Sequence, residues 1–252
     1  MQFNFLNKNG ETLSGRFEEP KGPLKATALF AHCFTCSKNV MAASIISKAL
    51  TESGIGVLRF DFTGLGASEG DFSNTNFSSN VEDLLSACAA LEKNFEHPQL
   101  IIGHSLGGAA VLKASTQLEK VKAVVTIGAP SDVDHVSHLF SDDLSKIKAE
   151  GKAEVCLAGR KFTIKQQFVE DIKELEILEG LKVFKKALLI MHSPTDGTVS
   201  IDHAAKLFVA AKHPKSFVSL DEANHLLSSK EDARYAAGVI GAWALKYLDF
   251  TG

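Results

Sequence analysis

Short apolar runs alternate with longer stretches of helical period along most of this chain. Runs this short are typical of strands buried on both faces, whereas the longer stretches repeat their apolar residues every three or four positions. The alternation predicts an α/β fold, with a mostly parallel central sheet and helices on both of its faces. The expected strands are 26–31, 57–60, 100–102, 123–127, 187–191 and 216–220. The expected helices are 41–52, 81–93, 106–118, 203–211 and 229–247.

The start of the chain follows a different pattern. The segments 2–7 and 12–18 alternate apolar and polar residues around Lys8-Asn9-Gly10. Asn and Gly tolerate positive φ in a tight turn, so this pattern predicts an N-terminal antiparallel hairpin. With the hairpin included, we expect a central sheet of about eight strands.

One long segment, 131–186, interrupts the alternation of strands and helices. It separates two expected strands by many more residues than a crossover needs. Within it, two short runs flank Ala158-Gly159-Arg160 like a small hairpin, and a charged helix is expected from about Lys165. We therefore expect a single domain over 1–252, with 131–186 inserted as a small cap or lid.

Charge and composition argue against several classes of function. The formal net charge is −3, and basic residues are scattered among acidic ones, so nothing attracts nucleic acid or an anionic membrane. The N-terminus lacks the basic and apolar regions of a signal peptide, and no apolar stretch approaches the roughly 20 residues of a membrane helix. We therefore expect a cytoplasmic protein with a small-molecule substrate.

The four cysteines, Cys33, Cys36, Cys88 and Cys156, are too few and too irregularly spaced for a disulfide scaffold. Reduced thiols are expected. The Cys33-x-x-Cys36 spacing also occurs in redox motifs, but packing is the simpler interpretation because a thioredoxin-like context is missing. The redox alternative predicts that oxidation of Cys33 or Cys36 lowers activity reversibly.

The pentapeptide Gly103-His104-Ser105-Leu106-Gly107 carries the first chemical signal. It lies between an expected buried strand and an expected helix, the context that gives a Gly-x-Ser-x-Gly motif its meaning. A sharp strand-to-helix turn presents the Ser105 hydroxyl at the carboxyl end of the sheet, beside the N–H groups of a helix start. Ser105 is therefore the candidate nucleophile.

A serine nucleophile needs a histidine to accept its proton and a carboxylate to orient that histidine. Asp196 follows the expected strand 187–191, and His225 follows the expected strand 216–220. Both positions face the same edge of the sheet as Ser105, and the chain order Ser, acid, His is that of this kind of site. Asp196 and His225 are therefore the candidate acid and base.

Other carboxylates compete with Asp196. Asp202 is close in sequence, but we expect it to cap the helix that starts at His203. Asp132 and Asp134 follow the preceding strand and remain an alternative position for the acid.

Two backbone N–H groups must meet the negative oxygen that forms during acyl transfer. Leu106 N–H, next to the nucleophile, is the first candidate. The second comes from the loop 32–38 after the strand 26–31, where we assign Phe34 N–H with Cys33 as the alternative.

These motifs, in this order, resemble the α/β-hydrolase superfamily of serine esterase type over nearly the whole chain. The residues of segments 32–38 and 60–66 and of the Gly-His-Ser-Leu-Gly-Gly motif are similar to those in the hydrolase half of bacterial proteins that fuse such a domain to an OsmC-type domain. The resemblance implies a functional link to an OsmC-type protein. It also implies a catalytic triad and an oxyanion hole, formed by Ser105, Asp196, His225, Phe34 and Leu106.

The expected reaction is hydrolysis of carboxylic esters with small or short-chain acyl groups. A thioester, a small amide or a carbon–carbon bond is open to the same triad, and a non-catalytic binding module on the same fold is the alternative from another class. No cofactor or metal is expected, because 61–70 lacks the Lys-Ser/Thr of a phosphate loop and no convincing metal-ligand cluster is present. A dehalogenase would need a carboxylate at position 105.

Overall fold

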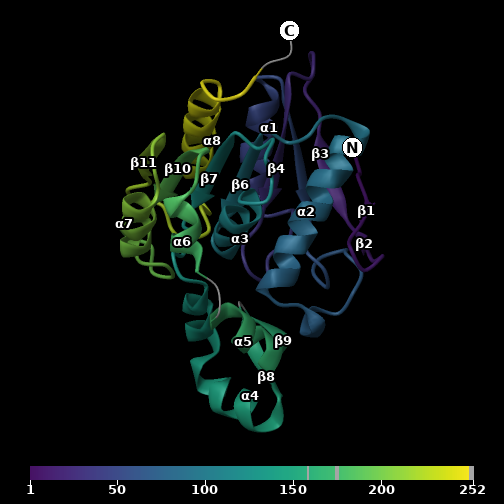
Figure 1. The fold of residues 1–252 in the computed structure, drawn as a ribbon, viewed down its shortest axis with the longest axis vertical. Helices are drawn as coiled ribbons and strands as arrows, with labels where there is room; N and C mark the ends of the chain where they lie inside the picture. The colour runs from purple at the N-terminus through teal and green to yellow at the C-terminus, as the bar shows by residue number, and fades with distance from the viewer. Residues whose placement is uncertain (158, 174–175, 250–252) are drawn as a thin grey trace.

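A seven-stranded sheet runs through the middle of the molecule in this computed structural model, which describes residues 1–157, 159–173 and 176–249 (Figure 1). The strand order is β11-β10-β7-β6-β4-β5-β3, and every neighbouring pair is parallel except β3 and β5. The mostly parallel sheet expected from the sequence is confirmed, with seven strands rather than about eight. The strands are β3 (Gly15–Glu18), β4 (Ala26–Ala31), β5 (Ile55–Phe60), β6 (Leu100–His104), β7 (Ala123–Ile127), β10 (Ala187–His192) and β11 (Lys215–Ser219).

The N-terminal hairpin is confirmed, but its second arm divides. β1 (Phe5–Leu6) pairs with β2 (Thr12–Leu13) in a separate two-stranded sheet, around a turn in which Gly10 has a φ of 82°. β3 instead joins the central sheet antiparallel to β5. The backbone passes very close to the first residues at Gly15, where a Cβ would lie 2.3 Å from the Phe3 carbonyl oxygen. Because of this close approach, the segment 12–18 pairs with β1 through β2 and with β5 of the central sheet through β3.

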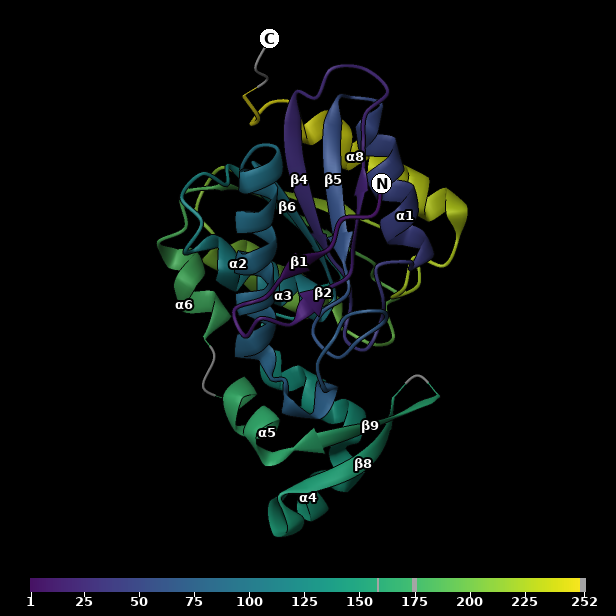
Figure 2. The ribbon, with the colours of Figure 1, turned by 90° about the vertical axis from the view of Figure 1, so that its right-hand side faces the viewer.

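Helices cover both faces of the central sheet. α1 and α8 lie on one face, and α2 and α3 lie on the other (Figure 2). β4 contributes to both cores, because Ala28 and Phe30 pack beneath α1 and α8 while Leu29 and Ala31 pack on the opposite side. Its apolar run is therefore continuous rather than alternating. Outside the segment between β7 and β10, called the insertion below, the helices are α1 (Met41–Thr51), η1 (Phe72–Asn74), α2 (Phe77–Asn94), α3 (Leu106–Ser115), α7 (Ile201–Ala210) and α8 (Lys230–Ala244).

Between β7 and β10 the chain leaves the central sheet. Most of this segment lies beyond one end of the sheet, where α4, α5, β8 and β9 are grouped (Figures 1 and 2). β8 and β9 form the expected antiparallel hairpin, although Ala158 of its turn lies outside the described residues. The description of the chain as one domain with a cap at 131–186 stays a prediction. The elements here are η2 (Val133–Asp143), α4 (Leu144–Glu150), β8 (Lys152–Leu157), β9 (Arg160–Lys165), α5 (Gln166–Lys173) and α6 (Ile177–Lys182).

The helices in the described ranges are all too short or too polar to cross a membrane.

Three buried histidines lie at the carboxyl ends of central strands: His32 directly after β4, His104 at the end of β6 and His192 at the end of β10. Burial lowers the pKa of His32 from 6.5 to about 4. Burial, followed by the nearby His225, lowers the pKa of His104 to about 4 as well. Since a buried imidazolium loses its hydration, the native state keeps these rings neutral.

This burial predicts that the native state becomes less stable as the pH is lowered. Below about pH 6.5 the unfolded chain binds a proton at His104 that the native state does not bind until about pH 4, so acid favours unfolding. His104→Gln removes this titration and keeps a side-chain N–H donor. In urea unfolding, lowering the pH from 7 to 5 should reduce the free energy of unfolding of the variant by about 2 kcal/mol less than that of the wild type.

The exposed His138 provides the matched control, because His138→Gln should follow the wild type across the same range. Parallel stability curves for His104→Gln and the wild type would contradict the prediction.

Candidate active site

Ser105 occupies a sharp turn between β6 and α3. Its φ of 55° and ψ of −126° are unusual for a residue with a side chain, and its N–H donates to the Ile127 carbonyl oxygen at 2.8 Å. The neighbouring glycines make the turn fit: a Cβ on Gly103 would lie 2.3 Å from the Gly107 carbonyl oxygen, and one on Gly107 would lie 2.3 Å from that of His32. The turn therefore also brings the start of α3 against the loop after β4.

The structure brings Ser105, His225 and Asp196 together in one hydrogen-bonded chain. His225 Nε2 lies 2.9 Å from Ser105 Oγ, and His225 Nδ1 lies 2.7 Å from Asp196 Oδ2. Asp196 comes from the loop after β10, and His225 comes from the loop after β11. Gly128, with a φ of 57°, leaves room for the pair, because a Cβ there would be 3.3 Å from Asp196 Oδ2.

The Asp196 carboxylate is held in its charged form. Burial acts to raise its pKa, but the hydrogen bond with His225 and the N–H groups of Val199 and Thr198 outweigh burial and leave the pKa below its usual value. Those two N–H groups reach Asp196 Oδ1 at 2.9 and 2.8 Å. One carboxylate oxygen is thus fixed by backbone, and the other faces the imidazole.

Among the candidate carboxylates, Asp196 is the one with a described hydrogen bond to His225. Asp132 accepts a hydrogen bond from Asp134 N–H at the start of η2. Asp202 does not cap the following helix, so that expectation was wrong. α7 begins at Ile201, two residues before the expected start, and Ser200 is its N-cap, accepting from Asp202 N–H at 3.2 Å.

Two further histidines support the site, and the sequence interpretation did not assign them. The neutral ring of His104 donates from Nε2 to the His225 carbonyl oxygen at 2.6 Å. His192 Nε2 bonds to the Val199 carbonyl oxygen at 2.8 Å and lies 3.7 Å from Asp196 Oδ2. The available signal was position alone, because each residue ends a strand directly before a candidate site loop.

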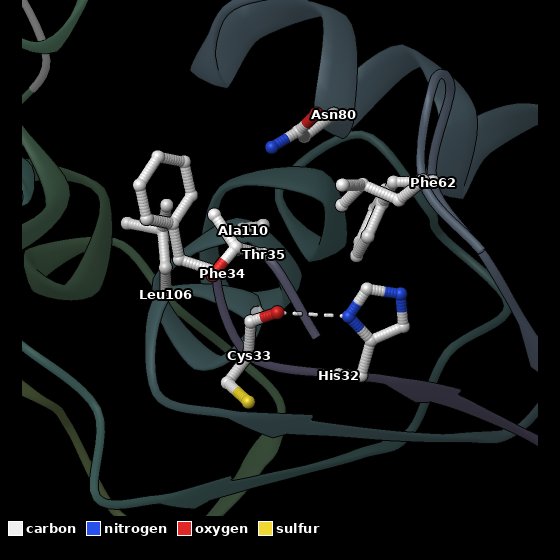
Figure 3. Close-up of a pocket in the computed structure, with 10 residues that line it drawn as sticks. His32, Cys33, Phe34, Thr35, Phe62, Asn80, Leu106 and Ala110 are labelled. Carbon is white, nitrogen blue, oxygen red and sulfur yellow. Dashed lines mark hydrogen bonds between the residues drawn. The ribbon is translucent and has the colours of Figure 1, made fainter. Parts of the chain in front are cut away.

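The loop after β4 carries the other candidate donor. Phe34 N–H has no hydrogen-bond partner among the described residues, and Leu106, as the first residue of α3, has an N–H free of intrahelical bonding. Phe34 and Leu106 both line a cavity of about 10 Å³, roughly the room for one water (Figure 3). The other lining residues are His32, Cys33, Thr35, Phe62, Leu65, Asn80, Gly107 and Ala110.

The expectation of four reduced thiols is wrong for this loop. Cys33 and Cys36 form a disulfide, and their Cα atoms are 5.4 Å apart. Cys36 N–H donates to the Cys33 carbonyl oxygen at 3.1 Å, so a tight turn brings the two side chains within bonding range. Cys88 and Cys156 are free.

Buried charges anchor the far end of the loop. Lys38 N–H donates to Asp61 Oδ1 at 2.6 Å, and Lys38 Nζ donates to Asp61 Oδ2 at 2.5 Å. Arg59 donates to the Lys38 carbonyl oxygen and pairs with Glu18. The Lys38 and Asp61 side chains are only 11% and 1% exposed. Since burying such pairs is costly unless their geometry is good, the loop is firmly placed.

Residues of the insertion contact the same loop. Arg160 donates to the Thr35 carbonyl oxygen, and the rings of Phe34 and Phe168 lie 5.4 Å apart between centroids. Phe140, Phe168 and Phe184 are buried, and Phe162 packs against Phe72. Phe140 and Phe168 also contact each other, so Phe140, Phe162 and Phe168 join the segment between β7 and β10 to the loop after β4 and to Phe72.

In the described ranges, no group of three or more His, Cys, Asp or Glu side chains is arranged to hold a metal ion.

Comparisons with known proteins agree with this fold. The esterase domain of a Rhodothermus marinus protein has a solved structure that is 49% identical, covers 98% of each chain and superposes with a TM-score of 0.80. An uncharacterized 31.7 kDa protein of Escherichia coli, from the traX-finO intergenic region, is 30% identical over 184 residues, which are 71% of this chain and 64% of that protein. The mitochondrial palmitoyl-protein thioesterase ABHD10 of Mus musculus is 28% identical over 130 residues, which are 51% of this chain and 42% of that protein. These matches span less than two thirds of the curated relatives' own length.

The family model described as serine aminopeptidase, S33, matches residues 22–149, about half of the chain. The matched region contains the turn at Ser105 and the loop after β4. The sheet topology and the likeness to the Rhodothermus marinus domain extend the agreement over nearly the whole length. This chain therefore belongs to the serine aminopeptidase S33 family of hydrolases, within the α/β-hydrolase superfamily.

Proposed function

We propose that this hydrolase cleaves carboxylic esters through an acyl-enzyme, with Ser105 as nucleophile, His225 as general base and acid, and Asp196 as the orienting carboxylate. The observation that carries the proposal is the hydrogen-bonded chain from Ser105 Oγ through the His225 ring to Asp196 Oδ2, at 2.9 and 2.7 Å. Three residues far apart in sequence meet here in the order that activates a serine.

The reaction follows from this arrangement. Ser105 Oγ attacks the acyl carbon while its proton passes to His225 Nε2. Asp196, held ionised, stabilises the imidazolium and keeps Nδ1 protonated. His225 then protonates the departing alcohol, and later takes a proton from the water that attacks the acyl-enzyme. As the bond between the acyl carbon and Ser105 Oγ breaks, His225 returns this proton to Oγ and the carboxylic acid leaves.

The backbone N–H groups of Phe34 and Leu106 are the proposed oxyanion hole. Removing one such donor costs about 3 to 4 kcal/mol of transition-state stabilisation, so their placement makes a large contribution beside that of the triad. Supporting the assignment, the Phe34 N–H has no protein partner in the described residues, and Leu106 begins the helix that follows the nucleophile.

Small or short-chain acyl groups suit the surroundings of these donors. The Phe34 ring lies 5.8 Å from the Phe72 ring and 5.4 Å from the Phe168 ring, so aromatic side chains occupy space beside this donor. The name of the Rhodothermus marinus relative, an esterase domain, also favours ester substrates.

Thioester hydrolysis is the second candidate, favoured by the similarity to the mouse palmitoyl-protein thioesterase. The same nucleophile, base and oxyanion donors serve both reactions, since an acyl-enzyme forms from either substrate. The two candidates differ in the leaving group.

Replacing the nucleophile should abolish hydrolysis. Ser105→Ala is expected to lower kcat on a short-chain nitrophenyl ester by at least about 10⁴-fold, because no acyl-enzyme can form. A fluorophosphonate probe should label the wild type and leave the variant unlabelled. Equal turnover of the two proteins would contradict the assignment of Ser105.

Neutralising the acid should nearly match that loss. Asp196→Asn is expected to lower kcat about 10⁴-fold, because the amide favours the wrong imidazole tautomer. Asp202→Asn, in the first turn of α7, is the matched control and should keep turnover within about threefold of the wild type. A large loss of kcat in Asp132→Asn with none in Asp196→Asn would show instead that the acid is Asp132, after β7.

A panel of matched oxygen esters and thioesters should rank the substrates. With acyl chains from two to sixteen carbons, we expect kcat/KM to be highest for short chains and to fall by roughly tenfold or more for long ones, because aromatic rings already occupy the space beside Phe34. A preference for palmitoyl thioesters over all short oxygen esters would instead establish the second candidate.

A further inference from the structure

The turn that carries Phe34 is closed by a covalent bond. Cys33 and Cys36 bracket Phe34 and Thr35, and their disulfide joins the two ends of the turn. Thr35 has a φ of 59°, in the left-handed region that β-branched residues rarely adopt. A conformation of this kind persists only where its surroundings hold it.

Non-covalent contacts hold the loop on either side of this turn. Upstream, His32 Nδ1 bonds to the Cys33 carbonyl oxygen at 2.8 Å (Figure 3). Downstream, Lys38 is anchored to Asp61 by two hydrogen bonds. Within the turn, the Cys33 carbonyl oxygen, which shares a peptide unit with Phe34 N–H, also accepts from Cys36 N–H. Arg160 donates to the Thr35 carbonyl oxygen, and the Phe34 ring contacts the rings of Phe72 and Phe168. The disulfide adds a covalent constraint to these contacts on the peptide unit that contains Phe34 N–H.

A reductant can reach this disulfide through one of its two sulfurs. Cys33 is only 4% exposed, whereas Cys36 is half-buried. A thiolate of a small dithiol attacks Cys36 Sγ, breaks the S–S bond and leaves Cys33 as a thiolate that takes up a proton. The second thiol of the reagent then displaces Cys36, so the reagent is oxidised to a disulfide and two electrons pass to the protein.

We propose that the Cys33–Cys36 disulfide positions Phe34 N–H for the oxyanion, and that reduction of this bond by a dithiol lowers turnover at Ser105. The inference rests on the proposed ester hydrolysis. Cys33 and Cys36 act here as positioning residues, and the oxidised protein is the more active form. This direction is opposite to the one expected from the sequence, because the crosslinked turn already presents the donor.

The effect falls on kcat rather than on KM. The negative oxygen develops only after Ser105 attacks, so its donors stabilise the transition state more than the bound ester. Freeing the turn lets Phe34 N–H sample other orientations and leaves the triad untouched. A purely structural role of the disulfide would instead appear as a lower melting temperature with unchanged kcat at low temperature.

The test compares oxidised and reduced wild type on a short-chain nitrophenyl ester. After treatment with dithiothreitol, kcat should fall by about tenfold to a hundredfold, up to the loss expected for one oxyanion donor, while KM changes less than about threefold. Oxidised glutathione should restore kcat. Thiol labelling with mass spectrometry confirms which cysteines are reduced in each sample.

Two variants separate this disulfide from other thiols. The Cys33→Ser/Cys36→Ser double variant should have the low kcat under both conditions, with no response to dithiothreitol. Cys156→Ser is the matched control, because it removes the exposed thiol able to crosslink two molecules and should keep the full wild-type response. Cys88 needs no variant, since burial raises the pKa of its thiol to about 12 and keeps it unreactive.

Hydrogen exchange over residues 33–37 gives a readout independent of ester hydrolysis. Reduction should speed amide exchange in this segment and leave the segments around Ser105 and His225 unchanged. Unchanged kcat in wild type with both cysteines reduced would overturn the proposal, as would loss of the response in Cys156→Ser. If neither form hydrolyses any ester, the proposed function fails, and unchanged exchange in the reduced protein would then separately overturn the positioning role.

Discussion

The left-handed backbone of Ser105 is the constraint around which the site is arranged. A non-glycine residue at a φ of 55° costs of the order of 1 to 3 kcal/mol, so the surroundings must hold it in place. They do so through the bond from Ser105 N–H to Ile127 and through the two glycines that let β6, α3 and the loop after β4 approach closely. The same tight turn sets Leu106 at the start of α3. Without this turn, the Ser105 hydroxyl, the start of α3 and the loop after β4 would not lie close together.

Buried charge pairs hold the loop after β4 rigidly at this edge of the sheet. Burying Lys38, Asp61, Arg59 and Glu18 removes four charges from water, and such pairs rarely stabilise a fold more than apolar residues of equal size. Their geometry suits another purpose, because Asp61 holds both the backbone and the ammonium group of Lys38. Under the proposed mechanism, a loop fixed in this way needs no rearrangement when charge develops beside it. The buried charges and the disulfide act on opposite ends of the same short segment.

Positions relative to strands were predictable from sequence, whereas side-chain pairing was not. β4 and β7 match their expected bounds because continuous apolar runs identify strands buried on both faces. Ser105, Asp196 and His225 could be grouped as candidates from the sequence because each follows a strand, and the carboxyl ends of parallel strands meet at one edge. The disulfide was missed because Cys33-x-x-Cys36 spacing gives no Cα distance until the turn is known. η2 was missed because a 3₁₀ helix kinked at Phe140 does not keep the 3.6-residue apolar period, and α4 was missed because the period is weak over seven residues.

The insertion and the candidate oxyanion loop form one packed unit. Phe168 packs against Phe34, and Arg160 reaches the Thr35 carbonyl oxygen, so two elements of the insertion contact consecutive residues of the turn. Packed interiors transmit small displacements because they contain little free space. A substrate that shifts the β8–β9 hairpin or α5 would therefore also shift the peptide unit of Phe34. Under the proposed ester hydrolysis, the choice of acyl group and the stabilisation of the oxyanion would depend on the same contacts, and selectivity would arise in kcat as well as in binding.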